Sequence, residues 1–157
     1  MSTITTIDDV TGPELVSLDL AAHDARSAIE ELTALFERAG RVTDRTAYAE
    51  AVWAREQETG GTGMESGIAI PHAKSSAVAR PSVAFGRSAT GVGFGAEDGT
   101  PADLIFLIAA PEGADDLHVT LLSRLARRLI HQEFRTALRQ ADSPRAVIDI
   151  IRREVQL

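Results

Sequence analysis

The sequence predicts a single-domain α/β/α sandwich, in which a central mixed β-sheet is flanked by helices on both faces. Two observations place it in this α/β class. The chain has 157 residues, a length that suits one domain. Short apolar runs typical of strands are interleaved with amphipathic segments typical of helices. Strands and helices that alternate in one domain favour a sheet covered on both sides.

The N-terminal third predicts an arm, a strand and two helices. Residues 1–13 are polar and Thr-rich and end in Gly12-Pro13, so we expect a flexible N-terminal arm followed by a domain over residues 14–157. A strand is expected over residues 15–20. Asp24 begins a helical pattern that stops at Gly40, and Thr43 or Asp44 can cap a second helix that ends at residues 59–61.

The middle of the chain predicts most of the sheet. A glycine-rich loop over residues 60–67 leads into the short apolar run Ile68-Ala69-Ile70, which Pro71 is expected to close. Further strands are expected at residues 83–85, 91–94 and 104–108, with a turn at Asp98-Gly99. The run over residues 104–108 is apolar without alternation, so this strand is expected to be buried on both faces.

Three helices are predicted in the C-terminal third. The clearest runs from about Asp115 to Ile130, with Asp115 or Asp116 as its cap. A short helix is expected over residues 133–140. Ser143 as N-cap and Pro144 at the first helical position predict a last helix.

Composition excludes several classes of function. Lys and Arg number 16 against 23 Asp and Glu, and a net charge of −7 argues against nucleic-acid binding. The chain has no cysteine, which rules out disulfides, thiolate zinc sites and cysteine nucleophiles and fits a reducing compartment. Neither a leader segment nor an apolar run of membrane-spanning length is recognisable, so a cytoplasmic protein is expected.

Several motifs fail a structural requirement of the chemistry that they suggest. Residues 91–96 match G-x-G-x-x-G/A, but a turn follows where dinucleotide binding needs a helix. The loop over residues 60–67 lacks the G-K-[ST] ending of a phosphate loop, and no G-x-S-x-G elbow is present. Asp115, Asp116 and His118 crowd into one helical turn without a second ligand cluster. We therefore expect no cofactor and no metal.

Two of the four histidines are candidate functional residues. His23 and His131 are expected to be surface or helix-end residues. His72 follows a proline after a short strand, where a side chain can be exposed yet rigidly held. His118 lies in the first turn of a predicted helix, where the helix dipole favours a neutral imidazole and attracts phosphate.

Arg55 completes a site that suits phosphoryl transfer. A histidine that accepts a phosphoryl group needs a neutral ring with one free nitrogen, a hydrogen bond on the other nitrogen, and donors around the phosphoryl oxygens. Arg55 offers forked donors near the end of the second helix, and His118 offers another. His72 is then the candidate nucleophile, and no magnesium ion is required.

Four motifs together resemble one family. They are Gly67-Ile68-Ala69-Ile70-Pro71-His72-Ala73-Lys74, Arg55-Glu56 followed by Thr62-Gly63, the segment 103–111 that ends in Ala-Pro, and the segment 118–127. In this order they resemble the fructose/mannitol-type enzyme IIA domains (EIIA type-2) of the bacterial phosphoenolpyruvate-dependent sugar phosphotransferase system. The resemblance covers about residues 15–155.

The resemblance implies specific roles and partners. His72 would take a phosphoryl group from the phosphohistidine of the carrier HPr and pass it to a IIB domain, for fructose uptake, with Arg55 and His118 stabilising the transferring group. The phosphoryl group would be carried covalently, without a cofactor. The domain would reach the membrane IIC permease only through IIB.

A second hypothesis shares the same site. The chain also resembles nitrogen-type regulatory IIA proteins, in which phosphorylation of His72 would control binding to another protein and no sugar would be moved. An unreactive interaction domain is a third reading, which the joint presence of Arg55, His72 and His118 disfavours. The histidine motif does not separate the first two hypotheses.

Overall fold

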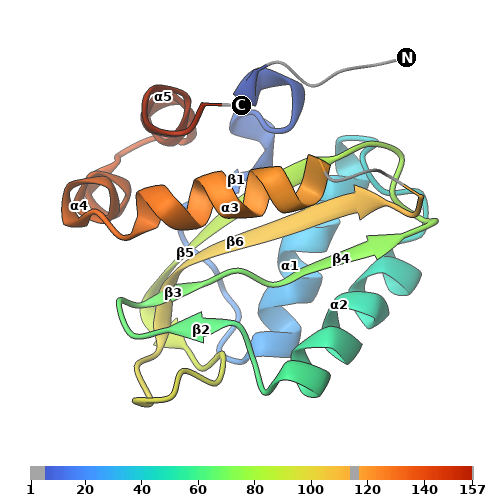
Figure 1. Ribbon diagram of the computed structural model, residues 1–157, viewed down its shortest axis with the longest axis horizontal. Helices are drawn as coiled ribbons and strands as arrows, with labels where there is room; N and C mark the ends of the chain where they lie inside the picture. Colours follow the sequence, from blue (N-terminus) through green and yellow to red (C-terminus); the bar gives the residue numbers. More distant parts are fainter. Residues whose placement is uncertain (1–5, 114–116, 157) are drawn as a thin grey trace.

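A six-stranded mixed sheet forms the middle layer of the protein (Figure 1). The computed structural model describes residues 6–113 and 117–156, the side chains of residues 117–119 excepted. The strands are β1 (Val16–Ser17), β2 (Gly63–Met64), β3 (Ile68–Ala69), β4 (His72–Ser75), β5 (Ser82–Val92) and β6 (Ala102–Pro111). Their order is β1-β5-β6-β3-β2, and β4 also pairs with β6. β5 and β6 are antiparallel, whereas β3 and β4 both run parallel to β6.

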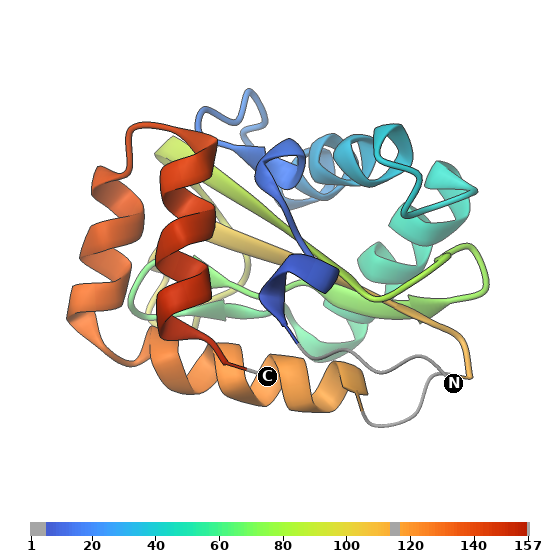
Figure 2. The ribbon, with the colours of Figure 1, turned by 90° about the horizontal axis from the view of Figure 1, so that it is seen from above.

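Helices cover both faces of the sheet, as Figure 2 shows. They are α1 (Ala25–Arg38), α2 (Arg45–Thr59), α3 (Leu117–Leu129), α4 (Gln132–Gln140) and α5 (Pro144–Glu154). α1 and α2 pack on one face, and α3, α4 and α5 pack on the other. The predicted α/β/α sandwich is therefore confirmed.

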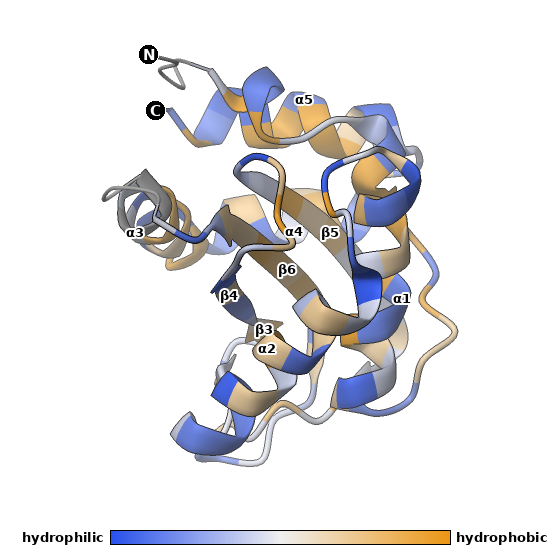
Figure 3. Cartoon of the chain, turned by 90° about the vertical axis from the view of Figure 1, so that its right-hand side faces the viewer, coloured by the Kyte–Doolittle hydropathy of each residue, from blue (hydrophilic) through white to orange (hydrophobic). Residues whose placement is uncertain are grey.

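The central strand β6 separates two hydrophobic cores. Leu104 and Phe106 point into the core under α3, α4 and α5, whereas Ile105 and Leu107 point into the core under α1 and α2. All four side chains are fully buried, so the prediction of a strand buried on both faces is confirmed. In Figure 3, hydrophobic residues run along β6 and along the side of α5 that faces the sheet.

Three helix starts are capped by side chains, of which Asp44 and Ser143 were predicted as caps and Asp24 only as the start of a helical pattern. The side chains of Asp24, Asp44 and Ser143 each accept a hydrogen bond from the backbone N–H three residues later. Pro144 then occupies the first helical position, and Gly60 ends α2 in the left-handed conformation with φ +80°. Asp115 and Asp116, the predicted caps of α3, lie outside the described residues.

The prediction of a flexible N-terminal arm is wrong for the part of it that the structure describes. Two short 3₁₀ turns, η1 (Ile7–Asp9) and η2 (Pro13–Leu15), pack against the domain. Ile7 and Val10 are only 4% and 1% exposed and belong to the core under α5. Their burial, together with the Arg152–Asp8 ion pair at 2.7 Å, holds a polar-looking segment in place.

Two expected strands differ from the prediction in extent. The strand expected over residues 15–20 is reduced to β1, which pairs with β5. The runs at residues 83–85 and 91–94 were expected as separate strands, but a single strand, β5, extends to Val92 through an irregularity after Arg87. A bulge lets the ladder resume on the same partner strand, a pairing that local sequence does not reveal. The turn at Asp98-Gly99 is confirmed by a hydrogen bond from the N–H of Gly99 to the carbonyl of Ala96.

Pro71 interrupts the edge of the sheet but does not end it, contrary to the prediction. Ala69 is opposite Ile105 and His72 is opposite Ile108, so β3 and β4 follow β6 in one unbroken register. Proline lacks an N–H but keeps its carbonyl, and the Pro71 carbonyl accepts a 3.0 Å hydrogen bond from the N–H of Ile108. His72 is therefore the first residue of a paired strand.

No helix in the described ranges combines the length and the hydropathy that a membrane span requires.

Candidate functional site

The ring of His72 is held through one nitrogen. Nδ1 lies 2.8 Å from the carbonyl oxygen of Ile70, two residues earlier, and the side chain is half-buried. A carbonyl oxygen only accepts hydrogen bonds, so Nδ1 must carry the proton in this contact. A neutral ring in this tautomer keeps its lone pair on Nε2. The geometry gives His72 the fixed tautomer and the free nitrogen that a nucleophilic histidine needs.

The segment before His72 is fastened to α2 by a short chain of hydrogen bonds. Oε1 of Glu56 accepts from the N–H of Thr62 at 3.1 Å, and Oγ1 of Thr62 accepts from the N–H of Ile70 at 3.2 Å. We call this arrangement the Glu56–Thr62–Ile70 tether. It fixes the same residue, Ile70, whose carbonyl orients the ring of His72.

Glu56 is a buried carboxylic acid beside the candidate nucleophile. Its side chain lies in the interior, and the residue is 5% exposed. Burial raises the pKa of Glu56, while its hydrogen bonds with Thr62 and the field of His72 act in the opposite direction. The sequence contains a signal for this position, because Tyr48, Val52 and Glu56 are spaced by four residues on the buried face of α2. The prediction did not assign Glu56 a role in the site.

Tyr48 supports the strand opposite His72. Its hydroxyl donates a 2.8 Å hydrogen bond to the carbonyl of Ile108, the residue that faces His72 across β4 and β6. The ring is fully buried, and burial raises the pKa of its phenol well above the ordinary value. The hydroxyl is therefore a permanent donor that helps to position β6 behind the site.

Arg55 is exposed in the last turns of α2, next to Glu56. α2 packs against β4, the strand that carries His72. Among the residues that the structure describes, none forms a hydrogen bond or an ion pair with the Arg55 guanidinium. The guanidinium is therefore available to an incoming anion. A direct approach of Arg55 to the His72 ring stays a prediction.

His118 lies in the first turn of α3, on the opposite face of the sheet from α2. Its side chain lies outside the described residues, so its role beside His72 also stays a prediction. His23 and His131 are exposed, and His131 directly precedes α4, as predicted.

The glycine-rich loop allows two backbone segments to approach closely. At Gly61, φ is +110°, and a Cβ there would lie 2.0 Å from the carbonyl oxygen of Phe94. At Gly95, a Cβ would lie 2.1 Å from the carbonyl oxygen of Gly60. These glycines lock the loop after α2 against the segment after β5, on the path that leads from Glu56 to Thr62.

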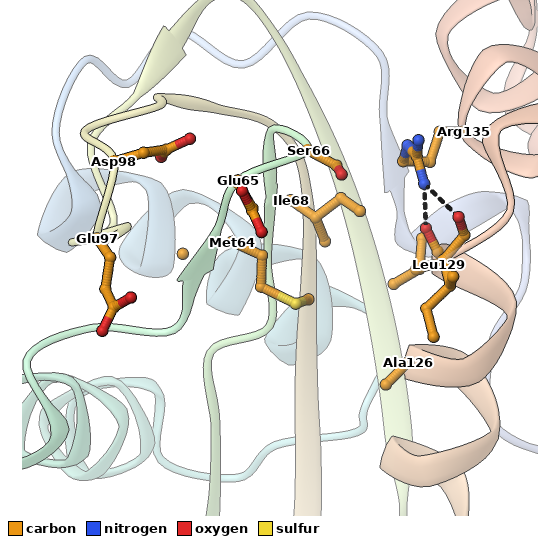
Figure 4. Close-up of a pocket in the computed structure, with 11 residues that line it drawn as sticks. Met64, Glu65, Ser66, Ile68, Glu97, Asp98, Ala126, Leu129 and Arg135 are labelled. Atoms are coloured by element: carbon orange, nitrogen blue, oxygen red, sulfur yellow. Dashed lines mark hydrogen bonds between the residues drawn. The ribbon is translucent and has the colours of Figure 1, made fainter.

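A cavity of about 540 Å³ has neither His72 nor Arg55 among its described lining residues, which Figure 4 draws as sticks. Its apolar wall comes from β2, β3 and the end of α3, and Glu65, Glu97 and Asp98 supply carboxylates. Arg135 caps α3 here by donating to the carbonyls of Leu129 and Ile130. The candidate site at His72 is therefore separate from this cavity.

No cluster suited to a metal ion occurs within residues 6–113 and 117–156, as far as their side chains are described.

The fold and the ring geometry define an α/β protein with a strand-borne histidine that has one free nitrogen. Residues 9–154 match the family model described as phosphoenolpyruvate-dependent sugar phosphotransferase system, EIIA 2. The chain belongs to this family, whose members are phosphoryl carriers rather than enzymes in the ordinary sense.

Relatives of two functional kinds are similar to this chain. It is 42% identical over 153 residues to a fructose-specific EIIA component of Haloferax volcanii, covering 98% of this chain and 99% of that protein. It is 44% identical over 136 residues to a fructose-specific EIIABC component of Bacillus subtilis, covering 87% of this chain but 21% of that longer protein. The crystal structure of the nitrogen regulatory protein IIA-Ntr from Neisseria meningitidis superposes with a TM-score of 0.84 at 32% identity, covering 92% of this chain and 98% of that one.

Proposed function

We propose that this protein accepts a phosphoryl group on Nε2 of His72 from phospho-HPr and passes it to a IIB domain of the fructose type. The observation that carries the proposal is the hydrogen bond from Nδ1 of His72 to the Ile70 carbonyl. This hydrogen bond leaves the lone pair on Nε2 and fixes the orientation of the ring. The residue is half-buried.

The proposed transfer moves one phosphoryl group between two ring nitrogens. The Nε2 lone pair of His72 attacks the phosphorus of the donor phosphohistidine, and the donor N–P bond breaks with its electron pair returning to the donor ring. Positive charge develops on the His72 ring, and the Ile70 carbonyl stabilises the Nδ1–H that carries part of it. Arg55 and His118 are the proposed donors to the phosphoryl oxygens. Onward transfer repeats the step in reverse, with the IIB nucleophile as attacking group.

The names of the relatives support fructose-type partners. The Haloferax and Bacillus relatives, at 42% and 44% identity, are both fructose-specific components, and the second combines EIIA, B and C parts in a single chain. By analogy, the proposed carrier would act in the cytoplasm and contact a IIC permease only through IIB.

The test is phosphorylation with labelled phosphoenolpyruvate, enzyme I and HPr. We expect one acid-labile, alkali-stable label, located on His72 by mass spectrometry. His72→Ala should take up no label, whereas His131→Ala, which changes an exposed histidine at the start of α4, should label normally. Full labelling of His72→Ala, or a label on another residue, would contradict the proposal.

The likeness to IIA-Ntr favours a second candidate function, in which phosphorylation of His72 controls binding to another protein. The two functions diverge after His72 is phosphorylated. The complete relay with a panel of fructose and mannitol IIB domains separates them, because the panel member that accepts the phosphoryl group identifies the pathway. Absence of transfer to every IIB domain, with phosphorylation-dependent capture of a kinase or transporter, would favour regulation.

A further inference from the structure

A second cavity lies between the C-terminal half of α3 and the end of α5, where these two segments meet in Figure 2. It measures about 380 Å³. Its lining consists of four arginines, one carboxylate and one amide, namely Arg124, Arg127, Arg128, Arg153, Glu154 and Gln156. We call it the arginine cavity. Among its described lining residues, neither His72 nor Arg55 occurs.

The arginine cavity is strongly positive although the chain has a net charge of −7. Glu154 is the one carboxylate among the described lining residues and is shared by two arginines, at 2.6 Å from Arg128 and 3.2 Å from Arg153. Arg124 donates to the backbone carbonyl of Gln156, which carries no formal charge. The described lining residues therefore leave a formal surplus of three positive charges. The carbonyl end of α5 faces the cavity and offsets about half a charge.

Several donors of these arginines are unused. Within the described part of the chain, Arg127 has no hydrogen bond or ion pair, and its side chain is exposed. Nε of Arg128 is buried and has no hydrogen-bond partner. A buried donor without a partner is a cost to the folded state, and like charges at positions i and i+4, such as Arg124 and Arg128, also destabilise a helix. An anion in the cavity would accept hydrogen bonds from the exposed guanidinium of Arg127 and offset the repulsion between the arginines.

The lining selects the chemistry of that anion. Guanidinium groups offer paired, planar donors that match the oxygens of phosphate. Each phosphate group carries about 1.5 to 2 negative charges near neutral pH, so two phosphate groups balance the surplus better than one. No aromatic side chain on which a nucleobase could stack occurs among the lining residues that the structure describes. A volume of about 380 Å³ lies within the ordinary range for small-molecule sites.

We propose that the arginine cavity binds a small anion that carries two phosphate groups, such as pyrophosphate or a sugar bisphosphate. This site is independent of the proposed phosphoryl transfer at His72. It would allow a phosphorylated metabolite to bind the carrier without occupying the transfer site.

The test is isothermal titration calorimetry with pyrophosphate at low ionic strength, without divalent metals. We expect saturable one-to-one binding with a dissociation constant below about 1 mM. Arg127→Ala and Arg153→Ala should each weaken binding by about tenfold or more, because each removes a charged donor. Arg145→Ala, which removes an exposed arginine at the other end of α5, is the matched control and should bind as the parent does. Circular dichroism of each variant establishes that it is folded.

Four further titrations assign the site and the ligand class. His72→Ala should bind pyrophosphate normally, and loss of binding in this variant would place pyrophosphate at the transfer site and overturn the proposal. Inorganic phosphate should bind at least about tenfold more weakly than pyrophosphate. If citrate binds with the same affinity as pyrophosphate, the cavity does not select phosphate groups, and the proposal is overturned. Binding of an acidic peptide without binding of pyrophosphate would assign the cavity to a protein partner and contradict a small-molecule site.

Discussion

Glu56 accepts a 3.1 Å hydrogen bond from the backbone N–H of Thr62, across the left-handed turn that ends α2. This contact joins a buried carboxylic acid to the loop that precedes the candidate nucleophile. This contact thereby holds the loop that leads into β3 against α2, the helix that packs on β4, and β4 begins at His72.

The first prediction concerns the pH dependence of stability. Burial raises the pKa of Glu56 in the folded protein, so the folded state binds this proton more tightly than the unfolded chain does. Its contribution to stability is fully present below the unfolded-state pKa of about 4.5 and is lost as pH rises through the folded-state pKa. Glu56→Gln should therefore flatten the decline of the unfolding free energy above pH 4.5, measured by urea unfolding. Glu58→Gln, at an exposed position of the same helix, should leave the profile unchanged.

The second prediction concerns the Thr62 hydroxyl. Thr62→Val keeps the size of the side chain but leaves the N–H of Ile70 without its acceptor. We expect the unfolding free energy to fall by about 1–3 kcal/mol and the phosphorylation of His72 to slow, because the carbonyl of Ile70 is no longer fixed. Thr62→Ser retains the hydroxyl and should behave like the parent in both measurements. Equal rates for the valine and serine variants would remove the tether from the mechanism.

The third prediction concerns the close backbone contact at Gly61. Backbone strain alone costs about 1–3 kcal/mol at such a position. Gly61→Ala should lower the unfolding free energy by more than this, because the added Cβ also collides with the Phe94 carbonyl. Gly60→Ala is a matched control, since its φ is +80° but no atom lies within 4 Å of the added Cβ. The difference between the two variants in chemical denaturation measures the contact itself, and equal losses would mean that the contact contributes nothing.

The fourth prediction concerns the tautomer of His72. In ¹⁵N NMR spectra of the neutral ring, Nδ1 should have the shift of a protonated nitrogen and Nε2 that of an unprotonated one, because Nδ1 donates to Ile70. After phosphorylation, coupling to phosphorus should appear at Nε2. A phosphoryl group on Nδ1 would require the bond to Ile70 to break and would contradict the proposed mechanism.

The fifth prediction concerns the two proposed transition-state donors. Arg55→Ala and His118→Ala should bind HPr normally but transfer the phosphoryl group about 10- to 1,000-fold more slowly, since each would remove one donor to the phosphoryl oxygens. Arg38→Ala, which changes an exposed arginine at the end of α1, should transfer at the parental rate. Rapid-quench kinetics with phospho-HPr measure the rates, and an unchanged rate would exclude that residue from the transfer step.

Local sequence was sufficient to predict the helices. Asp24, Asp44 and Ser143 act on backbone groups within one turn of themselves, so their capping role depends on neighbours in the chain. The buried strand over residues 104–108 was likewise visible, because burial on both faces requires a continuous apolar run.

The errors of prediction involve partners that are distant in sequence. Residues 7–10 look polar, and their burial depends on a surface that α5 and the sheet supply. β4 resumes after Pro71 because β6, more than 30 residues later, continues beside it. The role of Glu56 depends on the path of a glycine-rich loop that returns Thr62 to it. The motif was sufficient to propose His72 as the nucleophile, an assignment that stays a prediction, whereas it did not indicate the groups that hold its ring.

The register of β4 along β6 has a consequence for how partners would distinguish the two forms of the carrier. His72 is the first residue of a strand whose backbone is already paired, so a phosphoryl group there adds about two negative charges without a new backbone conformation to adopt. The two forms would then share one shape and differ in the electrostatic potential around a single ring. A partner that prefers one form must sense charge rather than conformation, and this preference should weaken as salt screens it.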